Sequence, residues 1–167
     1  MKTKNFLFVL FILLLYSCSP QEDIVTFYGE DTLSKEMIVS TTINEELQNS
    51  FNSSVTIDLL DSKFFEKYID HLIELKATSI KISITDYNYG IVNSKLEMGN
   101  DLLIDNCIDE ISQSEGSITI TDPEVLGNIS NRLMYKHKIP FILSGSSRFS
   151  DTFTVSISVT FNGVFGD

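Results

Sequence analysis

The stretch Thr152–Phe161, TFTVSISVTF, decides the fold of this chain, because apolar and hydroxyl side chains alternate along it without a break. Successive side chains of a β-strand point to opposite faces of a sheet, so the segment has one dry face and one wet face. Branched and aromatic residues on the dry face suit a strand that packs on a core. These residues are Phe153, Val155, Ile157, Val159 and Phe161. We expect a half-buried strand of an antiparallel sheet.

The same two-residue period recurs upstream, in residues 54–59, 80–85, 118–120 and 139–143. Several short alternating strands predict a mainly β fold, an antiparallel β-sandwich of immunoglobulin-like character without the Cys and Trp hallmarks of antibody domains. Residues 144–147, SGSS, are typical of a turn, so the strands on either side are expected to form a hairpin. A barrel and a two-layer α+β sheet are the alternatives.

Two segments change to a 3.6-residue period and are predicted to be short helices that connect strands. Residues 61–76 carry one broad apolar face, with Asp61 or Ser62 as N-cap. Residues 122–136 begin with Asp122 as N-cap and Pro123 in the first turn. We expect each helix to close an open end of the sandwich or to cover one of its faces.

The N-terminal residues predict export. Lys2 and Lys4 precede an uncharged apolar run, Phe6–Tyr16. A helix of that length spans roughly 16 Å, at about 1.5 Å per residue, whereas a bilayer core is about 30 Å thick. The run is therefore interpreted as the apolar region of a signal peptide rather than as a membrane span.

Residues Leu15–Cys18, LYSC, resemble the lipobox of bacterial lipoproteins, although Tyr16 is bulkier than the usual residue at that place. The resemblance implies cleavage before Cys18, a diacylglycerol on its thiol and a further acyl chain, such as palmitate, on the new amino group. Several acyl chains hold a protein firmly to a membrane, whereas one holds it only reversibly. A plain secretory signal with an incidental cysteine is the alternative.

The residues after Cys18 indicate to which membrane the lipidated protein is delivered. Ser19 stands where an Asp would resemble an inner-membrane retention signal, which favours the outer membrane. The acidic tripeptide at residues 21–23, QED, resembles the surface-export signal of Bacteroidetes lipoproteins and implies exposure at the cell surface. The chain is thereby divided into a signal peptide at 1–17, a lipidated N-terminus and tether at 18–31, and a single sandwich domain at 32–167.

Composition limits the partners of that domain. The hydrophobic fraction of 43% is too high for a disordered chain, and the formal net charge of −11 becomes more negative when the two lysines of the signal peptide are removed. This acidity argues against nucleic acid as a partner and against an electrostatic grip on anionic lipid.

No residue pattern specifies a reaction. His71 and His137 are far apart, and no zinc, P-loop or nucleophile-elbow spacing occurs. Cys107 lies among apolar and acidic neighbours, which raise the pKa of a thiol, so we expect a buried structural cysteine. Acidic pairs such as Asp101 and Asp105 lack the calcium-loop pattern. We expect no catalytic residue, no metal site and no cofactor.

One segment has the composition of a contact loop. Tyr87, Asn88 and Tyr89 follow a predicted strand, and exposed Tyr with Asn is typical of loops that contact sugars and proteins. Packing of the aromatic rings against the end of the sandwich is the alternative.

The order of strands and helices resembles the late-embryogenesis-abundant type 2 sandwich and small Bacteroidetes outer-membrane lipoproteins of unknown role. We expect a lipid-anchored, non-catalytic binding or accessory domain at the outer membrane or cell surface, with a protein or glycan as partner. A carboxylate-based hydrolase and a carrier of an apolar ligand between sheet and helices are the alternatives.

Overall fold

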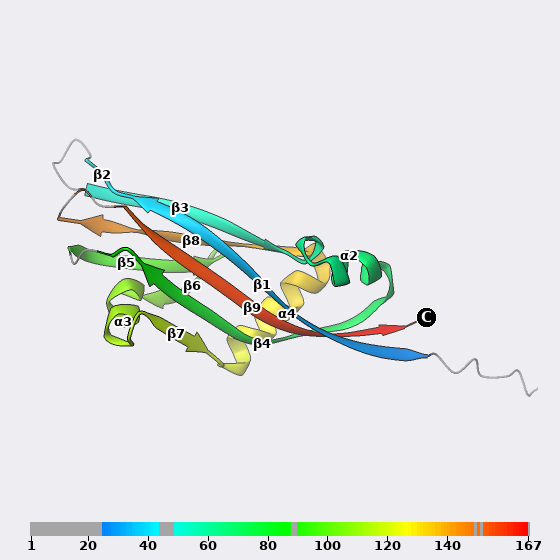
Figure 1. Cartoon of the computed structure of the whole chain (residues 1–167). Helices are drawn as coiled ribbons and strands as arrows, with labels where there is room; N and C mark the ends of the chain where they lie inside the picture. The colour runs from blue at the N-terminus through cyan, green and yellow to red at the C-terminus, as the bar shows by residue number, and fades with distance from the viewer. Residues whose placement is uncertain (1–24, 44–48, 88–89, 149, 151, 167) are drawn as a thin grey trace, which may run out of the picture.

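The structure is a computed structural model that describes residues 25–43, 49–87, 90–148, 150 and 152–166. Two antiparallel sheets, ordered β1-β9-β4-β7 and β2-β3-β8-β5-β6, enclose one hydrophobic core (Figure 1). The prediction of a mainly β antiparallel sandwich is confirmed. The strands are β1 (Thr26–Ser40), β2 (Thr42–Ile43), β3 (Asn49–Asp58), β4 (Leu72–Thr85), β5 (Ile91–Met98), β6 (Asp101–Asp105), β7 (Ser117–Ile120), β8 (Lys138–Ser147) and β9 (Thr152–Gly166).

Strand β9 lies between β1 and β4, and the alternation predicted for it is confirmed. Its apolar face is buried and extends beyond the predicted stretch to Phe165. The opposite face carries hydroxyls that lie next to those of β1: the Ser34 and Ser158 oxygens are 2.7 Å apart, and those of Thr32 and Thr160 are 2.9 Å apart. The strand therefore has one dry and one wet face.

The predicted boundary between tether and domain is wrong, because β1 begins at Thr26 and not after Asp31. All fifteen of its residues pair with β9. The ring of Phe27 stacks on Phe165 with centroids 5.2 Å apart, and Gly29 lies directly opposite Gly163. Few apolar residues mark the start of this strand, so the two-residue period is weak there in the sequence. Pairing with β9 defines where the strand begins.

The predicted hairpin is also wrong. Strand β8 pairs with β3 and β5, whereas β9 belongs to the other sheet. Residues 144–147, expected to turn, are the last part of β8, and Gly145 lies opposite both Phe51 and Ser94. The small side chains that are typical of a turn here allow close packing between two neighbouring strands.

The first predicted helix is only partly correct. The 3-10 turn η1 (Leu59–Asp61) leads into α2 (Lys63–Tyr68), with Ser62 as N-cap, and a second turn, η2 (Ile69–His71), follows. Residues 72–76, expected to be helical, are the start of β4, because pairing with β9 outweighs the local helical period.

The second predicted helix is α4 (Pro123–Lys136), and its start is confirmed: the Asp122 carboxylate accepts hydrogen bonds from the amides of Glu124 and Val125. A third helix, α3 (Cys107–Gln113), was not predicted. Its N-cap, Asn106, has φ 50°, a left-handed conformation that Asn tolerates better than most residues. The number of connecting α-helices in the described part of the chain is therefore three rather than two.

The sandwich has two unlike ends. At the first, which we call the aromatic end, β1 begins, β9 ends and β4 begins, and α2 adds three aromatic rings (Figure 1). The Phe165 ring packs there within 6.1 Å, centroid to centroid, of four other rings. These rings are those of Phe27, Phe64, Phe65 and Tyr68.

At the opposite end, which we call the loop end, three connections cross from one sheet to the other. They join β1 to β2 and β3, β4 to β5, and β8 to β9. The strand registers place the connections side by side, since Ser40 pairs with Thr152, and Ser147 lies opposite both Asn49 and Ile91. Strand β9 runs from one end to the other, and its fifteen residues span roughly 45 Å at about 3.3 Å per residue.

Candidate functional site

The loop end is the candidate binding site, and hydrogen bonds fix two of its connections to each other. The Arg148 amide donates to the Gly90 carbonyl oxygen over 2.8 Å, and the Ser147 hydroxyl donates to the same oxygen over 3.3 Å. Close by, the Ser146 hydroxyl donates to the Asn93 side-chain oxygen over 3.2 Å. The β4–β5 and β8–β9 connections therefore form one surface.

Tyr87, the first residue of the predicted contact loop, lies at this end. It is half-buried, and its ring meets Phe153 edge to face, with centroids 5.9 Å apart. Asp86, just before it, has φ 60° and turns the chain out of β4. Tyr87 thus packs against the end of the sandwich, as the alternative to an exposed contact loop predicted for this ring. Asn88 and Tyr89 lie outside the described residues.

A polar hollow adjoins Tyr87. It has a volume of about 320 Å³ and is lined by Ile84, Tyr87, Ser112, Glu115 and Gly116. The turn from α3 into β7 forms one wall and is held in place by the Ile84 amide, which donates to the Gly116 carbonyl oxygen over 3.1 Å. Small-molecule sites begin at about 300 Å³, so the hollow has room for one sugar ring or one side chain of a partner.

Most of the rest of the loop end is polar, although Val92, next to Asn93, is 51% exposed. Hydroxyl and amide side chains of this kind can form adaptable hydrogen bonds to a partner and lose little conformational entropy when they do so. The exposed or half-buried residues around the connections are Ser40, Ser50, Asn93, Ser144, Ser146, Arg148, Ser150 and Thr152. This set has no local pattern in the sequence, because three separate segments contribute to it; the available signal was the run of small residues at 144–147.

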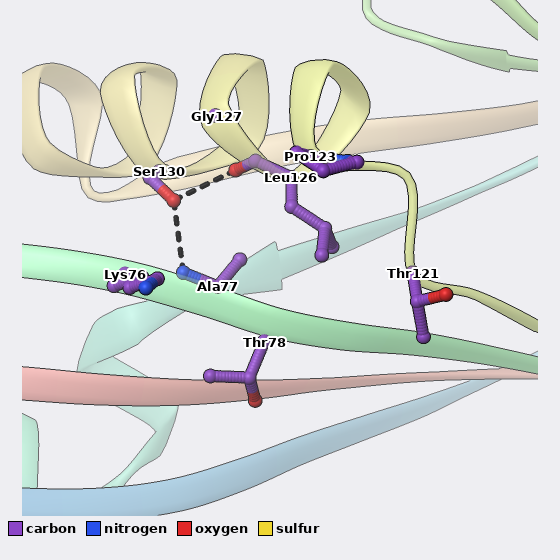
Figure 2. Close-up of a pocket in the computed structure, with 8 residues that line it drawn as sticks. All are labelled: Lys76, Ala77, Thr78, Thr121, Pro123, Leu126, Gly127 and Ser130. Carbon is purple, nitrogen blue, oxygen red and sulfur yellow. Dashed lines mark hydrogen bonds between the residues drawn. The ribbon is translucent and has the colours of Figure 1, made fainter.

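A second cleft, of about 400 Å³, lies between α4 and β4 (Figure 2). The Ser130 hydroxyl accepts a hydrogen bond from the Ala77 amide over 2.8 Å and donates to the Leu126 carbonyl oxygen over 2.7 Å, which attaches the helix to the edge of the strand. Strand β7 pairs only with residues 80–83 of β4, so α4 covers the edge that β7 leaves open. Half of the lining side chains are polar: Lys76, Thr78, Thr121 and Ser130.

Cys107 is fully buried and free, which confirms a structural cysteine. Desolvation by burial, with a smaller contribution from the Glu110 carboxylate, raises the pKa of the thiol to about 12. A neutral thiol is a poor nucleophile and a poor metal ligand.

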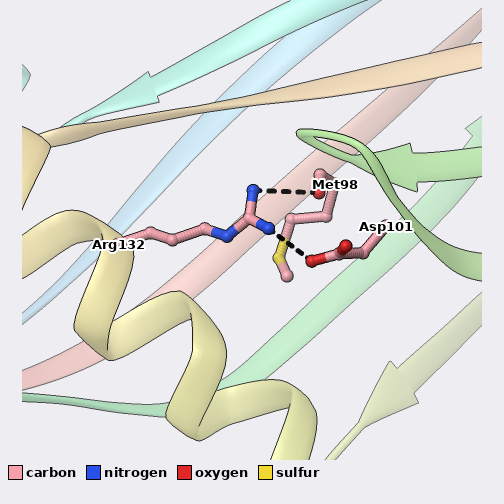
Figure 3. A network of polar contacts seen from close by, with 3 residues as sticks. All are labelled: Met98, Asp101 and Arg132. Carbon is pink, nitrogen blue, oxygen red and sulfur yellow. Dashed lines mark hydrogen bonds and ion pairs between the residues drawn. The ribbon is translucent and has the colours of Figure 1, made fainter.

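Asp101, one of the acidic residues considered for calcium, is paired with Arg132 (Figure 3). The same guanidinium donates to the Met98 carbonyl oxygen over 3.4 Å, so Arg132 binds the turn between β5 and β6 to α4. Within the described residues, no three His, Cys, Asp or Glu side chains gather as metal ligands would. Glu45 and Glu46, another acidic pair of the sequence, lie outside those residues.

Neither of the two histidines is part of a cluster of metal-ligating side chains in the described residues. The His71 ring nitrogen Nδ1 is 3.0 Å from the Gly166 carbonyl oxygen, at the aromatic end. His137 ends α4 in a left-handed conformation, and its amide donates to the Leu133 carbonyl oxygen. Cys18 and the signal peptide lie outside the described residues, and in the part that is described no helix is long and apolar enough to cross a membrane.

Comparison with known proteins names no family. Neither a known protein family nor a curated protein matches the chain. Among solved structures it is similar to the decameric BFDV capsid protein (TM-score 0.42, 7% identity, 83% of this chain and 99% of that one). It is also similar to turnip yellow mosaic virus (TM-score 0.37, 8% identity, 86% and 96%) and to a virus-like particle of the prawn Macrobrachium rosenbergii nodavirus (TM-score 0.39, 10% identity, 88% and 97%). These likenesses are too weak to assign a family or a function.

Proposed function

We propose that this chain is a lipid-anchored, non-catalytic binding or accessory domain of the outer membrane, exposed at the cell surface, that meets a protein or glycan partner through its loop end. One observation supports the arrangement above all: the described chain enters the sandwich at the aromatic end, and the polar connections lie at the other end of β9.

The spacing of the two ends suits such a role. An acyl chain on Cys18 would hold the domain by the aromatic end, since β1 begins only eight residues later. The loop end would then stand roughly 45 Å further from the membrane, at about 3.3 Å per strand residue. The hollow beside Tyr87 and the hydroxyl and amide groups around it would face outward, where a partner can reach them.

The anchor is tested with a Cys18→Ala variant in cells that are labelled with palmitate. We expect loss of both the label and membrane association, because the acylated thiol is gone. Cys107→Ala is the matched control, since it removes the buried thiol and should keep the label. Retention of label and membrane association by Cys18→Ala would rule out the anchor, and protease treatment of whole cells would distinguish the cell surface from the periplasm.

The partner surface is tested by binding of the anchored protein to glycan arrays and to isolated envelope proteins. A double variant, Asn88→Ala with Tyr89→Ala, should lose binding without loss of thermal stability. Tyr135→Ala is the control, because this side chain is 86% exposed on α4, away from the loop end. Equal loss in both variants, or loss in neither, would argue against the loop end as the contact site.

The apolar half of the cleft between α4 and β4, formed by Ala77, Pro123, Leu126 and Gly127, supports a second candidate, a carrier of an apolar ligand. Gly127 lines this cleft, and a Cβ atom added there meets no heavy atom within 4 Å. Lipid found by mass spectrometry in the purified protein, and absent from a Gly127→Leu variant, would support the carrier. Absence of co-purified lipid from both proteins would exclude it.

A further inference from the structure

The aromatic end exposes apolar side chains on a face whose neighbouring rows are polar; Ile38, 71% exposed, lies on the same face of β1 but near the loop end. Tyr28 and Ile73 are 78% and 52% exposed. Val164 lies directly opposite Tyr28 and also opposite Glu74, so the strip crosses β1, β9 and β4. Ile73 is the extra residue of a bulge in β4, between Leu72 and Glu74. We call Tyr28, Ile73 and Val164 the apolar strip.

The neighbouring rows of the same face are hydrophilic. Thr32 and Thr160 form the cross-strand pair two rows along from Tyr28 and Val164, and Ser34 and Ser158 form the next pair on that face. Singly exposed apolar residues need no explanation, but a strip across three strands at one tip is a mark of an interaction surface.

The short segment between Cys18 and the strip indicates that a membrane surface covers the strip. Cys18 is seven residues before Val25, the first residue that the structure describes, and Tyr28 follows three residues later. Whatever their conformation, seven residues reach at most about 25 Å, at about 3.6 Å each. An acylated Cys18 therefore keeps the strip, more than any other part of the domain, next to the membrane surface. A tyrosine ring is suited to that level, because it combines an apolar body with a polar tip.

We infer that the apolar strip rests on the lipid surface, with Tyr28 and Ile73 in the headgroup region, as a second membrane contact besides the acyl anchor; the inference rests on the proposed anchor at Cys18. The contact is apolar rather than electrostatic, since the acidic side chains of Glu30 and Glu74 stand beside the strip. Anchor and strip together would hold the sandwich in one orientation, with the loop end away from the bilayer.

The test uses the full lipidated protein in phosphatidylcholine vesicles that contain brominated lipid, which quenches a fluorophore only at close range. A thiol-reactive fluorophore is placed by Thr26→Cys or, as matched control, by Ser40→Cys. Both positions are exposed on the same strand and face, and fourteen residues, about 46 Å at 3.3 Å each, separate them. Cys107 takes no label, because it is buried and its thiol has a pKa of about 12.

We expect the label at residue 26 to be quenched several-fold more than the label at residue 40. Adding anionic lipid to the vesicles should not increase the quenching. Tyr28→Ser with Ile73→Ser should abolish most of that difference while palmitate stays on Cys18; both side chains are exposed, so the fold is retained. Equal quenching at residues 26 and 40, or quenching at 26 that the serine variant leaves unchanged, would overturn the inference. Cross-linking of two copies through residue 26 without quenching would show instead that a second copy covers the strip. Absence of palmitate would refute the anchor itself, which is a separate result.

Discussion

The same substitution, glycine to alanine, is expected to have opposite effects at Gly145 and Gly127. Gly145 lies inside β8 between two neighbouring strands, opposite Phe51 and Ser94. A Cβ atom there would stand less than 3.0 Å from both the Asn93 carbonyl oxygen and the Phe51 ring. Gly127 lies inside α4, and a Cβ atom there would have no heavy atom within 4 Å.

The loss of stability expected for Gly145→Ala depends on how far the groups around the new Cβ atom can move. The Phe51 ring is buried and packs edge to face on Phe153, with centroids 5.8 Å apart, so it has little room to retreat. The Asn93 oxygen belongs to the backbone of β5 next to a bulge in its pairing with β8, and displacing it would disturb that pairing. Overpacking of this kind costs about 1 to 3 kcal/mol, and alanine in a strand regains about 0.5 to 1 kcal/mol over glycine. Gly145→Ala should therefore lower the free energy of unfolding by about 1 kcal/mol, the difference between the midpoints of these two ranges.

Gly127→Ala should raise the free energy of unfolding by about 0.5 to 1 kcal/mol, because alanine restricts the unfolded chain and favours the helix. The assay is urea unfolding, followed by circular dichroism, of the chain that begins at Ser19. Thermal unfolding gives a second readout, at about 2 to 4 °C per kcal/mol for a domain of this size. The reasoning is refuted if Gly145→Ala unfolds at the wild-type urea concentration, or if Gly127→Ala unfolds at a lower one.

Three further predictions concern buried groups. Ser130→Ala removes the acceptor of the Ala77 amide, so the free energy of unfolding should fall by about 1 to 3 kcal/mol in urea, and a change below 0.5 kcal/mol would mean that water replaces the hydroxyl. Phe65→Ala empties a fully buried site that lies against the Phe165 ring, and the expected loss is about 3 to 5 kcal/mol; thermal stability equal to wild type would contradict this packing. Cys107 should resist iodoacetamide at pH 8 until the protein unfolds. Because folding raises the pKa of this thiol from 9.0 to about 12, its contribution to stability is complete below pH 9 and lost as the pH rises toward 12; a Cys107→Ala variant should lack this part of the pH dependence.

The sequence predicted the elements whose signals are local. In β9 the alternation of apolar and hydroxyl residues persists over many residues, and in α4 an N-cap, a proline and an apolar stripe agree with one another. The buried state of Cys107 was predictable from its immediate apolar and acidic neighbours. In each case the information lies within a few residues of the position concerned.

The errors arose where a distant strand outweighs the local pattern. Residues 72–76 have a helical period, yet they pair with β9. The glycine and serine residues at 144–147 are typical of a turn, yet they continue β8, because Gly145 fits between two neighbouring strands. The start of β1 has almost no apolar period and is ordered by pairing with β9.

The candidate site shows the same division. Tyr87 stood out in the sequence, but Arg148 and Gly90 are 58 residues apart and meet only because the strand registers bring their connections together. By itself the sequence determined that the chain forms alternating strands with one dry face each, and it predicts an export signal with a lipid anchor. Only the tertiary structure decided which strands pair, and thereby that the polar connections and the start of β1 lie at opposite ends of the sandwich. The physical reason is that alternation records only which face of a strand is buried, whereas pairing depends on backbone hydrogen bonds and side-chain fit between segments far apart in the chain.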